Sequence, residues 1–94
     1  MTEDVQLLLR DAISAVTALL EEEHIEACFR SREVARRSEK LGMVVLTAAA
    51  LNLEFAIKSG LRAAIKATSS TFMHELNTVT FAQDGSSFEL KESY

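Results

Sequence analysis

The chain has 94 residues, 48% of them apolar, and a formal net charge of −4, which describes one globular domain and excludes a disordered chain. The acidic total argues against a dedicated nucleic-acid binder, because contacts with phosphates need a basic face. A single cysteine, Cys28, excludes an intramolecular disulfide framework and fits a reducing compartment.

The N-terminal residues lack the charged, apolar and cleavage-site order of a signal peptide, since Glu3 and Asp4 come first. The apolar run over residues 41–57 is short for a membrane span of about 20 residues, and it carries Asn52 and Glu54. We therefore expect a cytoplasmic protein that does not enter a membrane.

The first 41 residues predict helix. No proline interrupts them, and Thr2 is suited to cap a first turn that holds Glu3 and Asp4. Apolar residues then recur at spacings of three and four, as on one face of a helix. They are Val5, Leu8, Leu9, Ala12, Ile13, Val16, Leu19 and Leu20. This pattern predicts one long helix over residues 1–41, and it leaves open a pair of helices with a break near residues 22–25.

Gly42 is the predicted end of this first part, because glycine readily adopts the left-handed conformation that ends many helices. A second, buried helix is predicted over residues 43–67 and ends at the tetrad of residues 68–71, TSST. Gly60 inside that helix costs about 1 kcal/mol relative to alanine, which predicts close packing at that point.

The C-terminal residues predict a β-hairpin over residues 78–91. Apolar and polar residues alternate on both sides of Asp84-Gly85, and an Asp-Gly pair favours a two-residue hairpin loop. With that loop, one face of the hairpin carries the four apolar side chains. These are Val79, Phe81, Phe88 and Leu90.

Together these elements predict a mainly α fold in a single domain over residues 1–94. It is a long antiparallel helical hairpin, with three helices as the alternative, followed by the short β-hairpin. A reversal at Gly42 places Arg30 opposite Glu54 and Glu26 opposite Lys58. These opposite charges favour that register over a slipped or parallel one. The alternative is that the same charges match between the two chains of a dimer.

The run over residues 41–57 is apolar on almost every side, and a helix of that kind must be buried all round. A chain of this length has little else to bury it with, so we expect a homo-oligomer, most simply a dimer. The residues expected to hold the dimer are Val44, Val45, Leu46, Ala49, Leu51, Leu53 and Phe55.

Residues 30–40 hold the basic cluster of the chain. On a helix these side chains share or adjoin one face, which makes them candidates for contacts with a protein partner or with phosphate. They are Arg32, Arg36, Arg37 and Lys40. Nucleic acid is not the expected main partner, and a nucleic-acid-binding regulator that uses this segment is the alternative function.

No catalytic, metal or nucleotide motif stands out. His24 and His74 lack a second ligand at the spacing of a metal site, and the glycines are isolated rather than grouped in a phosphate loop. Glu54 and Lys58, four residues apart, are interpreted as an ion pair rather than as a tuned general base. Cys28 is interpreted as a packed structural cysteine. We therefore expect no enzyme activity, no cofactor and no metal.

Residues 48–64, AAALNLEFAIKSGLRAA, resemble in texture the central helix of HEPN-type helical domains. His74-Glu75-Leu76 resembles the segment that follows it there. The resemblance covers less than half of the chain and implies a helical subunit. Ribonucleases of that family carry an Arg followed closely by a His, whereas Arg62 and His74 are far apart here, so the implied subunit lacks the usual catalytic motif.

The function expected from these patterns is that of a small, non-enzymatic protein–protein interaction module. An adaptor, a chaperone-like protein or a regulatory subunit fits this description. It would act as a homodimer with a further protein partner.

Overall fold

The chain is helical throughout the part that the computed structural model describes, which is the backbone of residues 3–84 and the side chains of residues 3–80. Its four helices are α1 (Glu3–Leu20), α2 (His24–Lys40), α3 (Val44–Ser59) and α4 (Arg62–Asp84). Only two or three residues connect one helix to the next, so neighbours in sequence run antiparallel.

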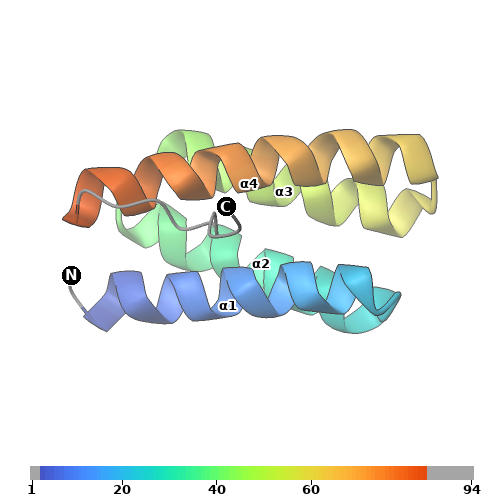
Figure 1. Cartoon of the computed structure of the whole chain (residues 1–94), viewed down its shortest axis with the longest axis horizontal. Helices are drawn as coiled ribbons and strands as arrows, with labels where there is room; N and C mark the ends of the chain where they lie inside the picture. Colours follow the sequence, from blue (N-terminus) through green and yellow to red (C-terminus); the bar gives the residue numbers. More distant parts are fainter. Residues whose placement is uncertain (1–2, 85–94) are drawn as a thin grey trace, which may run out of the picture.

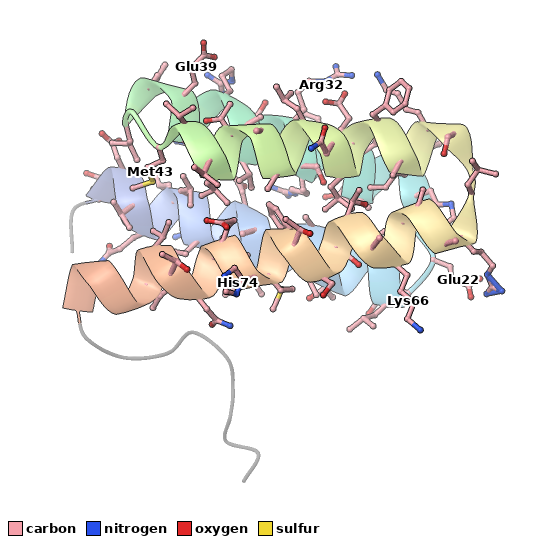
Figure 2. The ribbon with its side chains drawn as sticks, turned by 90° about the horizontal axis from the view of Figure 1, so that it is seen from above. Glu22, Arg32, Glu39, Met43, Lys66 and His74 are labelled. Atoms are coloured by element: carbon pink, nitrogen blue, oxygen red, sulfur yellow. The ribbon has the colours of Figure 1, made fainter. Side chains whose placement is uncertain are left out.

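The helices occupy the four corners of a bundle. Figure 1 shows α1 and α4 in front, with α2 and α3 behind them, and the view from above in Figure 2 shows α3 and α4 side by side over the other two helices. α2 packs extensively on both α1 and α3, and α4 packs on α3, whereas α1 and α4 make few direct contacts. α2 and α3 therefore form the central pair of the bundle.

One apolar core joins all four helices. Each helix turns its apolar stripe inward, as amphipathic periodicity requires. The largest fully buried apolar side chains of this core are Leu8 of α1, Val34 of α2, Leu46 and Leu53 of α3, and Phe72 and Leu76 of α4. The first part of the N-terminal stripe predicted for residues 5–20 is confirmed, since Val5, Leu8, Leu9 and Ala12 are buried in α1. Two of its later members, Ile13 and Leu20, are instead 49% and 81% exposed.

Small residues line the inward face of α2, and one of them is a buried serine. Ser31 is fully buried, and its hydroxyl has no hydrogen-bond partner among the described residues. Ser38 lies on the same face but donates to the Ala35 carbonyl at 3.1 Å and pairs with the Thr47 hydroxyl of α3 at 2.7 Å. Hydrogen bonds therefore offset the cost of removing the Ser38 hydroxyl from water, whereas the same cost is not offset at Ser31.

Ser31→Ala is expected to stabilise the fold by about 1 kcal/mol, because it removes an unsatisfied buried hydroxyl and adds a better helix former. Chemical denaturation measures this as a higher midpoint with an unchanged slope. Ser38→Ala is the matched control and should lose stability, since it removes the buried hydrogen bond between the Ser38 and Thr47 hydroxyls. Equal losses in the two variants would contradict this account of Ser31.

The first two turns close in the same way. The Glu23 amide donates to the Ala18 carbonyl at 2.8 Å, and the Met43 amide donates to the Ser38 carbonyl at 2.9 Å. This six-residue bond is the mark of a Schellman motif, which needs a left-handed residue just before the last donor. Gly42 supplies it with φ 76°, and Glu22 supplies it with φ 58°.

The single helix predicted over residues 1–41 is therefore wrong, and its alternative of two helices is confirmed. α1 ends at Leu20, and α2 begins at His24. The break falls on three glutamates, of which Glu22 adopts the positive φ that usually marks a glycine. The residue types at this turn do not predict it, since all three are glutamates.

The single helix predicted over residues 43–67 is also wrong, because the structure divides this stretch between α3 and α4. α3 ends at Ser59, and Gly60 adopts a φ of 74° as its C-terminal cap. A Cβ built on Gly60 meets nothing within 4 Å, so backbone conformation and not close packing explains this glycine. The tetrad 68–71 lies inside α4, where Thr68 and Thr71 donate to the carbonyls of Ala64 and Ala67.

The predicted β-hairpin is wrong where the structure tests it. Residues 78–84 are the last turns of α4, and the remainder of the predicted hairpin, residues 85–91, lies outside the described residues. Phe72, Leu76 and Thr80 are buried at successive spacings of four. This helical stripe continues through the residues whose alternation predicted a strand.

Candidate protein-docking surface

An apolar stripe on α3 faces away from the bundle. Val44 is 76% exposed, Leu51 is 49% exposed and Phe55 is 75% exposed, and Ala48 between them is exposed as well. The spacings of four, three and four residues are those of a heptad seam. We call these four residues, Val44, Ala48, Leu51 and Phe55, the α3 seam.

The seven predicted interface residues divide between the surface and the core. Val44, Leu51 and Phe55 lie on the seam, and Val45 beside it is 62% exposed. Leu46, Ala49 and Leu53 are buried within the chain's own core. The inner side of this helix is therefore covered by α2 and α4, and its outer side is left to a second molecule.

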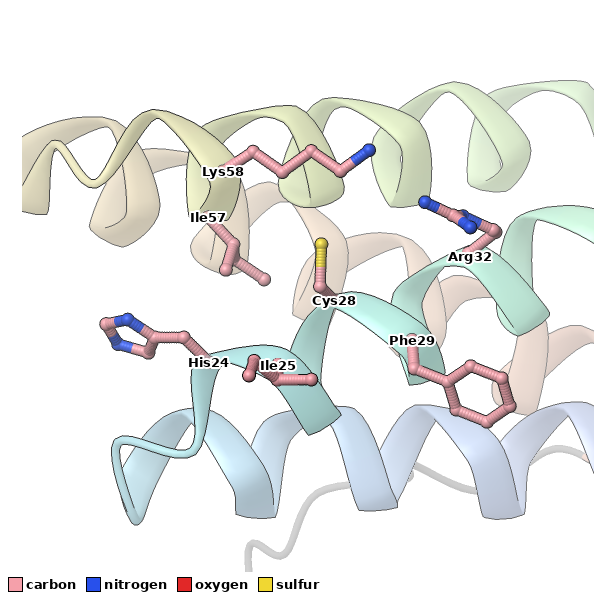
Figure 3. A pocket seen from close by; sticks show the side chains of 7 residues that line it. All are labelled: His24, Ile25, Cys28, Phe29, Arg32, Ile57 and Lys58. Atoms are coloured by element: carbon pink, nitrogen blue, oxygen red, sulfur yellow. The ribbon is translucent and has the colours of Figure 1, made fainter.

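Two further large apolar side chains protrude from α2, beside the seam helix. Ile25 is 89% exposed and Phe29 is 51% exposed, and the sequence reasoning did not select either of them. With Cys28 they line a groove of about 440 Å³ between α2 and α3, closed on the α3 side by Ile57 and Lys58. Figure 3 shows the Cys28 thiol pointing toward α3 between Ile57 and Arg32.

An ion cluster holds α2 against α3 next to this groove. Arg32 donates to one carboxylate oxygen of Glu54 at 2.7 and 2.8 Å, and Lys58 lies 3.2 Å from the same oxygen. Burial raises the pKa of Glu54, but the hydrogen bonds from Arg32 and Lys58 outweigh it and leave the pKa below its ordinary value. Arg32 and Lys58 therefore hold Glu54 in its charged form, as the predicted ion pair with Lys58 requires.

The predicted charge register is right in direction and wrong in detail. Reversal at Gly42 is confirmed, but Glu54 pairs with Arg32 instead of Arg30. Arg30 turns to the other side of α2, where it contacts Asp11 and Glu26. The charges alone do not tell which arginine of α2 faces α3, because Arg30 and Arg32 each have an acidic residue within reach.

The carboxylate of Glu54 makes the fold sensitive to acid. Because its pKa is lowered on folding, the pair contributes stability above the ordinary carboxyl pKa of about 4.3, and the contribution is lost as the pH falls through the folded-state value. Glu54→Gln should cost about 1 kcal/mol at pH 7, since both cations are largely exposed. Denaturation at pH 7 and pH 3 should show that the gap to wild type closes in acid. A gap that is constant with pH would contradict the assignment.

The basic cluster is mostly occupied by acids of the same chain. Arg32 binds Glu54, Arg36 pairs with Glu33, and the Nε of Arg37 donates to Asp11 at 2.9 Å. The fourth predicted residue, Lys40, is exposed at the end of α2. Arg32 and Arg37 therefore link α2 to α3 and α1, Arg36 pairs within α2, and the three charges are matched.

A second hollow lies at the opposite end of the seam from the groove. It has a volume of about 310 Å³ and is lined by Glu39, Gly42, Val44, Thr47, Ala48 and Leu51. Three of these residues belong to the α3 seam. The hollow is therefore an apolar recess with one acidic side chain, Glu39, on its rim.

The other features considered in the sequence are a metal site, a membrane span and the pair of Arg62 and His74. No three His, Cys, Asp or Glu side chains in the described part of the chain come together as metal ligands. Within residues 3–84, no helix has the length and apolar character needed to cross a membrane. Arg62 and His74 are both exposed on α4, where twelve intervening steps of the helix separate them by about 18 Å.

Comparison with known proteins finds no relative: no family model matches the chain, and no curated protein and no solved structure matches it. The resemblance to HEPN-type domains therefore stays a prediction.

Proposed function

We propose that this chain is a small, non-enzymatic protein–protein interaction module of the cytoplasm, which acts as a homodimer and uses the outer face of α2 and α3. The observation that carries the proposal is the set of large apolar side chains left exposed there. They are Ile25, Phe29, Val44, Leu51 and Phe55. Scattered single apolar residues need no explanation, but several on two adjacent helices indicate an interaction site.

Burial of such a surface against another protein is favourable at about 25 cal/mol per Å² of apolar area. Exposed aromatic residues contribute most, because each presents a large rigid area with few torsions to fix. Phe29 and Phe55 are the two aromatic residues of this face. They are the side chains from which we expect most of the binding energy.

Charge pairing within the chain supports a protein partner over a nucleic acid. Three arginines of the basic segment are engaged by Glu54, Glu33 and Asp11. A phosphate would have to displace these carboxylates to reach the guanidinium groups, and the net charge of the chain is −4. The electrostatic term that dominates nucleic-acid binding is thus weak here.

Photo-crosslinking in the native host tests the proposed function. A benzophenone amino acid at Phe29 or Phe55 should form protein adducts, whereas the same residue at His74, exposed on α4, should form few. Adducts that dominate at Phe29 and Phe55 support the module, and their masses separate self-association from a different partner. Equal or absent adducts at all three positions would reject it.

A further inference from the structure

We propose that the α3 seam docks antiparallel on the seam of a second copy, with Phe55 of each chain inserted into the hollow of the other. This inference rests on the proposed function. It adds which molecule covers the seam, a second copy of the chain, and the register in which the two helices pair. A side chain that is 75% exposed and a recess of about 310 Å³ lie on one face of the same helix. A closed cavity of about 150 Å³ holds a benzene molecule, so the recess has room for the phenyl ring.

The spacing of the seam fixes the register. In antiparallel helix pairs the two alternating seam positions face each other. Val44 then lies opposite the partner's Phe55, and Ala48 lies opposite the partner's Leu51. Two-fold symmetry repeats both layers, so all four seam residues of each chain are covered. The small Ala48 leaves room for the larger residue that faces it.

Charge favours the antiparallel arrangement over the parallel one. Lys58 lies one turn beyond Phe55, beside the seam. Its ammonium shares the Glu54 carboxylate with Arg32, and its side chain is still 56% exposed. Antiparallel docking carries it past Val44 toward the partner's Glu39, the acidic residue on the rim of the hollow. Glu39 forms no ion pair with any residue from 3 to 80. Parallel docking instead brings the two Lys58 side chains together and leaves both hollows empty.

The size of the contact predicts its strength. One seam of four residues is smaller than the interfaces of about 1,200–2,000 Å² that hold stable complexes. We therefore expect a reversible dimer with a dissociation constant in the micromolar range. Sedimentation or light scattering must consequently cover protein concentrations from about 1 to 500 μM.

Sedimentation velocity of three proteins tests the self-docking. Wild type should shift from monomer to dimer across the series, and Phe55→Ser should weaken the dimer at least tenfold. Leu61→Ser is the matched control, because Leu61 is 63% exposed but lies off the seam; it should dimerise like wild type. All three should melt alike when dilute. A wild type that is monomeric throughout, or a dimer that Phe55→Ser leaves unchanged, overturns the inference.

Disulfide trapping tests the register. In a Cys28→Ser background, Val44→Cys and Phe55→Cys chains are mixed and oxidised, and the products are identified by mass. The mixed dimer retains one of the two Phe55 contacts, and the antiparallel register predicts the mixed disulfide as the main product. If the main products instead join two copies of the Val44→Cys chain, or two copies of the Phe55→Cys chain, the antiparallel register is wrong. If Phe55 crosslinks to a different protein while the chain sediments as a monomer, the self-docking and the homodimer are wrong, and only the role as an interaction module for another protein stands.

Discussion

Leu53→Asp is expected to leave the chain largely unfolded, whereas Leu51→Asp, two residues away, should fold with a free energy of unfolding within about 1 kcal/mol of wild type. Leu53 is fully buried between the helices, and Leu51 is 49% exposed on the α3 seam. Removing a buried leucine costs about 3–5 kcal/mol, and burying an unpaired carboxylate adds several more. A domain of this size has about 5–15 kcal/mol in total.

Circular dichroism with urea denaturation measures the difference between the two variants. Leu53→Ala is the control that separates the cavity from the charge, and it should remain folded with an intermediate loss. Leu51→Asp has a second readout, because a charge on the seam should keep the folded chain monomeric. A folded Leu53→Asp variant with the melting temperature of wild type would refute the position of Leu53 in the core.

Asp11→Asn is expected to lower the free energy of unfolding by about 2–3 kcal/mol. Asp11 of α1 is only 7% exposed, and its two oxygens accept hydrogen bonds at 2.9 Å from Arg30 and Arg37 of α2. Loss of the carboxylate charge leaves the partly buried guanidinium of Arg37 without its counterion and removes one of the two carboxylates that Arg30 binds. Since α1 makes few contacts with α4 and packs mainly on α2, this cluster strengthens the contact that attaches α1 to the bundle.

Glu33→Gln provides the matched control for Asp11→Asn. Its pair with Arg36 lies within α2, one turn apart, and Arg36 is half exposed. Such a pair is worth about 0.5 kcal/mol or less. Urea denaturation of the two variants should therefore show a clear loss only for Asp11→Asn. Similar small losses in both would show that the Asp11 cluster contributes no more than a surface pair.

Part of the candidate site could be predicted from the sequence. The run over residues 41–57 marked α3 as the helix with excess apolar surface, and Val44, Val45, Leu51 and Phe55 are exposed on it. Its inward half could not be separated from its outward half, because a helix with leucine, valine or alanine on every side has no amphipathic direction. Phe29 and Ile25 were missed for the opposite reason, since single apolar residues among charges carry no periodic signal.

Local chemistry determined the helical character of the chain, the buried face of α1 and the reversal at Gly42. Each of these follows from residue type and spacing within a few turns. Only the tertiary structure decided the break at Glu22, the end of α3 at Gly60 and the continuation of α4 to Asp84. At Glu22 a non-glycine residue takes a left-handed conformation, which costs about 1–3 kcal/mol locally and is offset by the packing of two helices. In α4, burial of Phe72, Leu76 and Thr80 against the other helices outweighs the alternation from residue 78 onward that favoured a strand, because tertiary burial exceeds local strand preference in free energy.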